Sequence, residues 1–232
     1  MKVPWLPKSE IAKRAAGVIG DYQDMVGHPV EPPIPVEDII ERSLDVRFGF
    51  ADLEEATGMR DVLGATYVEK RLICVNERLL DDKHEGRMIF TCAHEVGHWV
   101  MHRPYVTEAK RFGFQNDAII CRTSNAKEPI EWQADCFAGS LLMPEDAVKE
   151  AFYRVCGVSP LELHNIKSAF RVNALCFDPS VESWPFIAAA VCEAGHFTNV
   201  SKQAMIIRLQ GLGLLVNLTD VKLGWNRSHQ SG

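Results

Sequence analysis

The chain has 232 residues, 47% of them hydrophobic, which suffices for one domain, or for a domain with a small appendage, around a proper core. Its 25 Lys and Arg against 31 Asp and Glu give a net charge of −6, which excludes an overall basic surface for nucleic acid. No apolar run approaches the ~20 residues that span a bilayer, and the first ten residues carry prolines and charges in place of a signal peptide's apolar core, so we expect a cytoplasmic protein with no membrane partner.

Helical and extended patterns alternate at the start of the chain. Residues 9–26 predict an amphipathic helix with Ser9 as its N-cap. Its apolar face is expected to contain Ile11, Ala15, Val18, Ile19 and Tyr22. Residues 28–35 contain four prolines and must be extended, because each proline biases the preceding residue away from the helical conformation. A short helix is expected at residues 36–43.

Three short stretches that follow have the alternating pattern of β-strands. They are residues 44–48, 64–68 and 71–75, and the last two are joined across Glu69 and Lys70 as a β-hairpin. We expect them to form a small antiparallel sheet that covers one side of the next helix. The sequence therefore predicts an α+β fold.

Residues 94–98 read H-E-V-G-H, the most informative motif of the chain. The apolar spacing around it predicts a helix over about 83–102, ended by Arg103 and Pro104. His94 and His98 are four residues apart, so both rings lie on one helical face, with Cβ atoms about 5–6 Å apart, where they can hold one metal ion. Glu95 would lie beside that ion and take a proton from a water that the ion activates, as in zinc-dependent hydrolases.

A third ligand is expected from a second helix, predicted over residues 129–143. Glu131 would complete the site, and Asp135, one turn later, could accept the second ring N–H of a ligating histidine. His102 continues the row of histidines, but its Cα lies about 12 Å along the axis from the first one at 1.5 Å per residue. We therefore assign His102 to packing or to the groups that surround the ligands.

Residues 103–127, between the two helices, read as a long polar loop. Pro104 stands where a metzincin would have its third histidine, which excludes that class. Basic residues outnumber acidic ones in the loop, so it is either a flap that contacts substrate or a crossover, and we favour the crossover.

The seven cysteines are scattered and form no C-x-x-C pair, which excludes a disulfide framework and a zinc knuckle. Most are expected to be buried small hydrophobic residues. Cys92 and Cys136 adjoin the proposed ligands in sequence, so an oxidation-sensitive site there is an alternative.

Two segments carry a resemblance to a known family. Residues 87–98, RMIFTCAHEVGH, and residues 131–144, EWQADCFAGSLLMP, resemble the ImmA/IrrE family of metallopeptidases. Residues 35–40 resemble the family's first helix, and residues 200–214 resemble its closing helix-turn-helix-like element. The resemblance covers about 30–216, except around 156–185.

This resemblance implies a minimal zincin-like metallopeptidase core with Glu95 as the general base. It implies three metal ligands, His94, His98 and Glu131. Members of the family act in bacteria and their mobile elements, and many cleave a helix-turn-helix repressor that silences stress or transfer genes, so the expected partner is such a protein. Zn²⁺ is expected in preference to Mn²⁺ or Fe²⁺, because a helical H-E-x-x-H with an internal Glu favours hydrolysis over the chemistry of iron oxygenases.

We expect four regions along the chain. They are an N-terminal helix (1–28), a zincin-like metallopeptidase domain (29–155), a C-terminal helical, helix-turn-helix-like region (156–216) and a flexible tail (217–232). Two helices are expected in the third region, over 186–194 and, capped by Ser201, through residue 210.

The alternative function is a DNA-binding or toxin–antitoxin regulator whose protease-like domain does not cleave. Residues 186–232 contain four basic and two acidic residues, which is too weak an excess to imply tracking of phosphates. We therefore expect the helix-turn-helix-like element to pack on the catalytic domain or to recognise substrate, and not to bind DNA.

Two features of substrate binding are also expected. One strand of the hairpin at 64–75 could pair with an extended stretch of substrate, with selectivity coming from docking on residues 186–216. The donor to the oxyanion is expected among Tyr67, His84, Arg103 and Tyr105.

Overall fold

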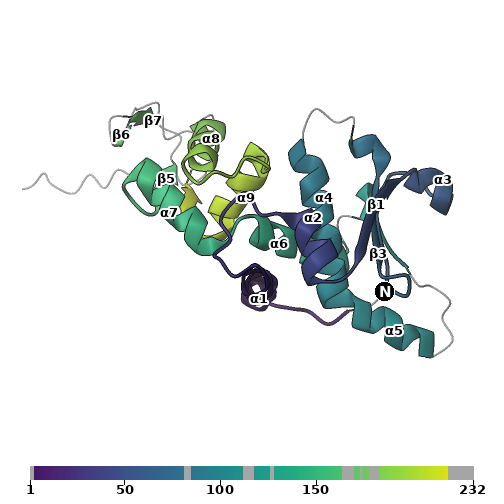
Figure 1. Cartoon of the computed structure of the whole chain (residues 1–232). Coiled ribbons are helices and arrows are strands. Elements are labelled where there is room, and N and C mark those ends of the chain that lie inside the picture. Colours follow the sequence, from purple (N-terminus) through teal and green to yellow (C-terminus); the bar gives the residue numbers. More distant parts are fainter. Residues whose placement is uncertain are drawn as a thin grey trace, which may run out of the picture.

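The computed structural model places a small β-sheet on one side of α4 and a group of helices on the other (Figure 1). It describes residues 3–80, 85–111, 118–125, 128–163, 170–172, 175–177 and 183–218. The α-helices are α1 (Lys8–Val26), α2 (Val36–Asp38), α3 (Leu53–Thr57), α4 (Glu85–Gly97), α5 (Arg103–Arg111), α6 (Pro129–Leu142), α7 (Glu145–Cys156), α8 (Trp184–Ala194) and α9 (Lys202–Gly211). The strands are β1 (Arg47–Ala51), β2 (Val62–Tyr67), β3 (Leu72–Asn76), β4 (Ala118–Arg122), β5 (Leu161–Leu163), β6 (Phe170–Val172), β7 (Leu175–Phe177) and β8 (Leu215–Asn217).

Short turns of helix extend several of these elements. Two π-helical turns follow α2 and α4, namely η1 (Ile39–Ser43) and η3 (His98–His102), and two 3₁₀ turns follow β3 and β4, namely η2 (Glu77–Leu79) and η4 (Thr123–Asn125). The predicted α+β class, with C-terminal helices after a core of helices and a small sheet, is confirmed.

Helix α1 has the predicted apolar face but a different start. The residues buried on it are Ile11, Ala15, Val18, Ile19 and Tyr22, as expected. The predicted N-cap, Ser9, is wrong, because the helix begins at Lys8 and Pro7 is the capping residue without a side-chain hydrogen bond. Pro7 already has the extended conformation of an N-cap, with φ −66° and ψ 149°, so Ser9 falls inside the first turn.

The sheet has the strand order β1-β3-β2-β4. The predicted hairpin is confirmed, since β2 and β3 pair antiparallel, with Ala65 opposite Cys74. The first predicted strand was placed three residues early, and its antiparallel orientation is wrong, because β1 runs parallel to β3. Helix α3 reverses the chain between β1 and β2, and the hairpin reverses it again, so β3 returns in the direction of β1.

Residues 103–127 are not the long loop that the sequence predicted. Helix α5 continues directly from η3, and β4 pairs with β2 at the edge of the sheet. The predicted helix end at Arg103 and Pro104 is wrong, because α5 begins there directly after the π-helical turn η3, whose hydrogen-bond pattern differs from that of an α-helix. Residues 112–117 and 126–127 of the segment lie outside the described residues.

Helices α4 and α6 cross at close range, which sets the geometry of the site between them. The predicted helix over 129–143 is confirmed as α6. At the crossing lies Gly97, where an added Cβ would be 3.2 Å from the Cβ of Phe137 and 3.3 Å from the Cα of Ala134. The glycine of the H-E-V-G-H motif therefore permits the close approach of the two helices.

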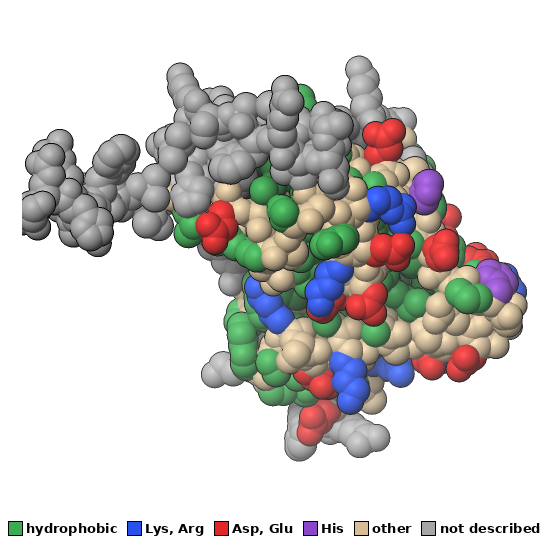
Figure 2. Space-filling view, turned by 90° about the vertical axis from the view of Figure 1, so that its left-hand side faces the viewer, with side chains coloured by type: hydrophobic (Ala, Val, Ile, Leu, Met, Phe, Trp, Pro, Cys, Tyr) green, Lys and Arg blue, Asp and Glu red, His purple; other side chains and the backbone are tan. Residues whose placement is uncertain are grey.

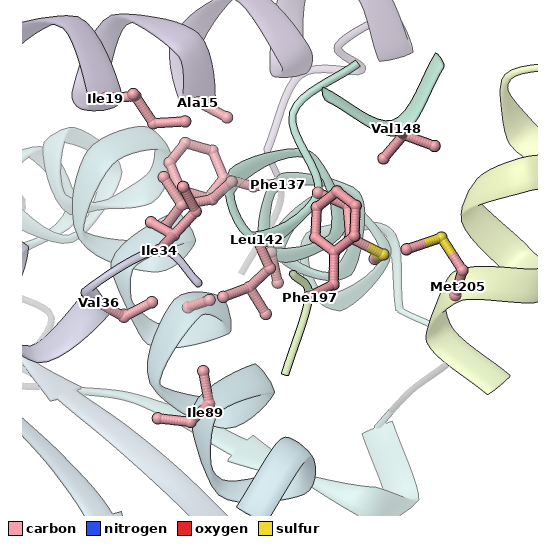
Figure 3. Close-up of a cluster of buried hydrophobic side chains, with 14 of the residues drawn as sticks. Ala15, Ile19, Ile34, Val36, Ile89, Phe137, Leu142, Val148, Phe197 and Met205 are labelled. Atoms are coloured by element: carbon pink, nitrogen blue, oxygen red, sulfur yellow. The ribbon is translucent and has the colours of Figure 1, made fainter. Parts of the chain in front are cut away.

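A continuous hydrophobic core joins α1, α4 and α6 to the C-terminal helices. Figure 3 shows Phe137 and Leu142 of α6 among side chains from the other elements, including Ile19, Val148 and Met205. All five of these residues are buried. The C-terminal helices therefore share the core of the region that contains the site.

The C-terminal helices agree with the prediction. Helices α8 and α9 cover the expected segments, and the Oγ of Ser201 accepts a hydrogen bond from the N–H of Ala204 at 3.1 Å, which confirms the N-cap. Residues 219–232, most of the predicted flexible tail, lie outside the described residues. In the described part of the chain, no helix has the length and apolar character needed to cross a membrane.

Candidate metal centre

Three side chains predicted as metal ligands meet between α4 and α6. The Nε2 of His94 lies 2.9 Å from the Nε2 of His98 and 3.1 Å from Oε2 of Glu131. The Nε2 of His98 lies 3.6 Å from Oε1 of Glu131. All three side chains are buried, and their ligand atoms lie within 4.8 Å of one another, so they form a group that could hold one ion.

The ligand atoms of His94, His98 and Glu131 would be stabilised by a cation between them. The Oδ1 of Asp135 lies 2.8 Å from the Nδ1 of His94 and accepts a hydrogen bond from it. The other ring nitrogen of His94, Nε2, therefore faces the site. Two imidazole nitrogens and a carboxylate repel one another at this range unless a proton or a metal ion is shared between them. Burial alone disfavours the charged ring, but Asp135 and Glu131 outweigh it and raise the pKa of His94 well above its usual value. Burial also opposes ionisation of Glu131, yet the contact with His94 at 3.1 Å and the nearby ring of His98 hold its pKa well below the usual range.

Glu95 lies next to this group but on the side of α4 that faces the sheet. Its Oε2 accepts a hydrogen bond of 2.6 Å from the hydroxyl of Thr66, while its Oε1 has no hydrogen-bond partner among the described residues. The side chain is fully buried, and burial raises the pKa of Glu95 to about 7. Burial thus disfavours the charged form of this carboxylate, a direction that suits a group that takes up and returns a proton.

Gly64 makes room for Glu95. A Cβ at this position of β2 would lie 2.8 Å from Cδ of Glu95 and 2.9 Å from its Cγ, distances that real Cβ atoms do not show. Gly64 and Thr66 are two residues apart on one strand and so face the same side of the sheet. The sequence reasoning missed both, although the period of two along the predicted strand could have placed them together.

The cysteine that lies at the site was also missed. Cys121 of β4 forms a second group with His94 and Glu95, in which the potential ligand atoms lie within 4.8 Å of one another. Burial raises the pKa of Cys121 to about 11, so its thiol is protonated near neutral pH. Cys92 and Cys136, the cysteines singled out from the sequence, are fully buried and partly buried respectively, and burial raises the pKa of both.

His102 lies behind His98, on the far side from the proposed ion. Its Nδ1 is 2.9 Å from the Nδ1 of His98, and its Nε2 is 3.2 Å from Oε1 of Gln133. Of the four candidates for the oxyanion donor, His84 lies outside the described residues, and the guanidinium of Arg103 lies 4.9 Å from the ring centre of Trp99.

Comparison with known families agrees with this geometry. The model of the peptidase M78 family, described as the IrrE N-terminal-like domain, matches residues 42–175, more than half of the chain. The chain belongs to this family. The matched residues include all three potential ligands, Glu95 and the whole four-stranded sheet. The family therefore makes the chain a metallopeptidase of the ImmA/IrrE type. No curated protein matches the chain.

Proposed function

We propose that this metallopeptidase is a zinc-dependent endopeptidase that cleaves a helix-turn-helix transcriptional repressor and so derepresses stress or mobile-element genes. The observation that carries the proposal is the meeting of two imidazole nitrogens and a carboxylate at one point, with the buried carboxylate of Glu95 beside it. Two histidines and one acidic residue are a common ligand set of catalytic zinc.

The ligand set favours zinc over Mn²⁺ or Fe²⁺. His94, His98 and Glu131 would hold the ion, since they offer two nitrogens and one oxygen in one buried group. Zinc bound there would lower the pKa of a water molecule and polarise the scissile carbonyl. Asp135 supports this site by holding the proton on the Nδ1 of His94, which leaves Nε2 as the ligand atom.

Glu95 would act as the general base and then as the general acid. Its Oε2 is held by Thr66, whereas its Oε1 is free to accept a proton from the attacking water. The same carboxyl would return the proton to the leaving amine. Gly64, which has no Cβ, lets the backbone of β2 pass close to Cδ and Cγ of this side chain.

The substrate strand would pair with β4. The hairpin strand that the sequence suggested for this role is unsuitable, because β2 and β3 both lie inside the sheet. Among the described strands, β4 is the edge next to β2, and its Cys121 lies beside His94. An extended segment paired with the outer edge of β4 would therefore run past the ligands.

Selectivity for a folded repressor would come from the C-terminal helices. Phe186 of α8 is 72% exposed and Ile207 of α9 is 60% exposed, so apolar side chains are available there for docking. Removing these helices would not test the idea, because Ile187 and Met205 belong to the shared core. The variants Phe186→Ser and Ile207→Ser change only the surface.

The test compares two substrates with the zinc-loaded protein. We expect one metal-dependent cut in a helix-turn-helix repressor, chosen from the neighbouring gene where that gene encodes one, little digestion of casein, and no cut with Glu95→Gln. The double surface variant should lose cleavage of the repressor while zinc binding persists. Rapid digestion of casein at many sites would reject the regulatory role and leave a general protease.

The DNA-binding alternative has less support. Lys202 and Arg208 are the basic residues of the described segment 183–218, besides His196, and the guanidinium of Arg208 donates to the carbonyl of Met143 at 3.0 Å and to Ser140 at 3.3 Å. On the described surface in Figure 2, basic and acidic side chains are interspersed. A salt-dependent gel shift with nonspecific duplex DNA would favour the alternative.

A further inference from the structure

A row of hydrogen bonds connects the metal site to the beginning of the chain. The Nδ1 of His98 lies 2.9 Å from the Nδ1 of His102. The Nε2 of His102 lies 3.2 Å from Oε1 of Gln133, whose Nε2 donates to the carbonyl oxygen of Pro4 at 2.9 Å. The row therefore joins three elements that are far apart in sequence: η3, α6 and the segment before α1.

The Pro4 end fixes the direction of every bond in the row. A main-chain carbonyl only accepts, so the amide group of Gln133 must face Pro4 and its oxygen must face His102. That oxygen also only accepts, so the Nε2 of His102 carries a hydrogen. A neutral His102 then has a lone pair on Nδ1, and the hydrogen between the two rings belongs to Nδ1 of His98.

Both rings are buried and meet through their Nδ1 atoms, which are 2.9 Å apart, so a single hydrogen lies between them. The partners of His102 in the row are an imidazole and a neutral amide, neither of which is an anion, so the buried ring of His102 carries one hydrogen, on Nε2. With its hydrogen on Nδ1, His98 presents the lone pair of Nε2 toward Glu131 and His94.

We propose that Gln133 and the carbonyl of Pro4 are positioning groups that hold His98, through His102, in the tautomer that can ligate a metal. The consequence for zinc rests on the proposed function, whereas the tautomers themselves belong to the metal-free protein. The structure thus gives the segment before α1 a part in the site, through Gln133 and His102.

Two contacts hold this segment in place independently of the row. The indole of Trp5 stacks on that of Trp132, with ring centres 4.5 Å apart and planes 15° from parallel. Val3 packs against a small apolar cluster of Val106, Ile119 and Ile130. The carbonyl of Pro4 is therefore held between two apolar contacts, next to the first turns of α6.

The direct test is the tautomer of each ring in the metal-free wild-type protein, measured from the ¹⁵N chemical shifts of the imidazole nitrogens near neutral pH. We expect the hydrogen of His98 on Nδ1 and that of His102 on Nε2. The opposite tautomer at either ring would overturn the proposal. This measurement requires no bound metal and no activity, so it is independent of the proposed peptidase function.

A matched pair of variants then separates the tautomer from simple tethering. Gln133→Met and Gln133→Glu both lose the amide that donates to Pro4, but only Glu keeps an oxygen that accepts from His102. We expect Gln133→Met to shift the tautomers of both rings and to weaken zinc binding about 10–100-fold in competition with a chromophoric chelator. Gln133→Glu should retain the wild-type tautomers and an affinity close to that of wild type.

Two results would overturn the role of Gln133. Equal loss of zinc affinity in both variants would mean that Gln133 only tethers the segment before α1. Wild-type tautomers and affinity in Gln133→Met would mean that His102 needs no partner there. Thermal unfolding of both variants, followed by circular dichroism, checks that the comparison is made between folded proteins.

Discussion

The two sides of α4 contribute to the site in different ways. On the side of the sheet, the hydroxyl of Thr66 donates a hydrogen bond to Glu95. The missing Cβ of Gly64 leaves the space that the Glu95 side chain occupies. On the side of α6, charged and polar groups contact the histidines, as Asp135 and Glu131 contact His94. In the proposed function, the position of the base therefore depends mainly on residues of the sheet, and the binding of the metal depends mainly on residues of α6.

The two histidines of the site differ in the group that contacts their Nδ1 atom. The Nδ1 of His94 faces the carboxylate of Asp135, whereas that of His98 faces the neutral ring of His102. A carboxylate both fixes the tautomer and makes the ring more basic, while a neutral partner only fixes the tautomer. Changes on the α6 side should therefore alter metal binding, and changes on the sheet side should alter turnover with the metal retained.

The largest effect is expected from Glu131→Ala. Loss of one of the three proposed ligands should abolish retention of zinc through dialysis, and activity with it. Glu128→Ala is the matched control, because Glu128 is an exposed residue just before α6 and should keep its zinc. Zinc per chain, measured by atomic absorption, decides the matter, and equal loss in the two variants would reject Glu131 as a ligand.

Glu95→Gln should reduce turnover by about 10²–10⁴-fold, the range that general acid–base catalysis supplies. The zinc content should not change, because the carboxylate lies on the sheet side of α4, where it is bonded to Thr66. Metal content and proteolysis are measured on one preparation. Loss of zinc in this variant would make Glu95 a ligand and remove the distinction between the two sides.

Gly64→Ala should reduce turnover about 10²-fold, the effect that a displacement of about 1 Å can have on a reacting group. The new Cβ would lie 2.8 Å from Cδ of Glu95, so the buried carboxylate must move. Gly49→Ala in β1 is the control, because a Cβ there meets nothing within 4 Å. Similar kcat values for the two variants would show that the close fit at Gly64 has no catalytic consequence.

Asp135→Asn should weaken zinc binding about 10–100-fold, since groups that orient a ligating histidine typically contribute this much. Asparagine keeps the size of the side chain but removes the charge that raises the pKa of His94. The affinity is measured by chelator competition. An unchanged affinity would mean that the carboxylate, which is 47% exposed, is too well solvated to act on the ring.

The smallest effect is a shift in pH dependence. The hydroxyl of Thr66 stabilises the ionised form of Glu95 and lowers its pKa, so Thr66→Val should raise that pKa. The base form is then lost at a higher pH, and the acidic limb of the kcat/KM profile should move upward by about one pH unit. Wild type and variant are compared with zinc bound, and a shift toward lower pH would contradict the assignment of Glu95 as base.

Local patterns predicted the helices better than the strands. The apolar face of α1 and the paired carboxylates of α6 follow from a period of 3.6 residues, which neighbouring residues define among themselves. The direction of β1 and the existence of β4 depend on pairing with distant strands, which no local pattern records. The predicted helix end at Pro104 was wrong for a similar reason, since a proline can follow the end of one helix or lie in the first turn of the next.

The sequence by itself determined which groups lie on α4 and α6, because helical spacing alone puts His94 next to His98 and Glu131 next to Asp135. Only the tertiary structure decided what those groups meet. Thr66 is 29 positions from Glu95, and Pro4 is 129 positions from Gln133, so their contacts exist only once the sheet and the segment before α1 have packed on the two helices. Burial follows from the same packing, and it raises the pKa of Glu95 to about 7.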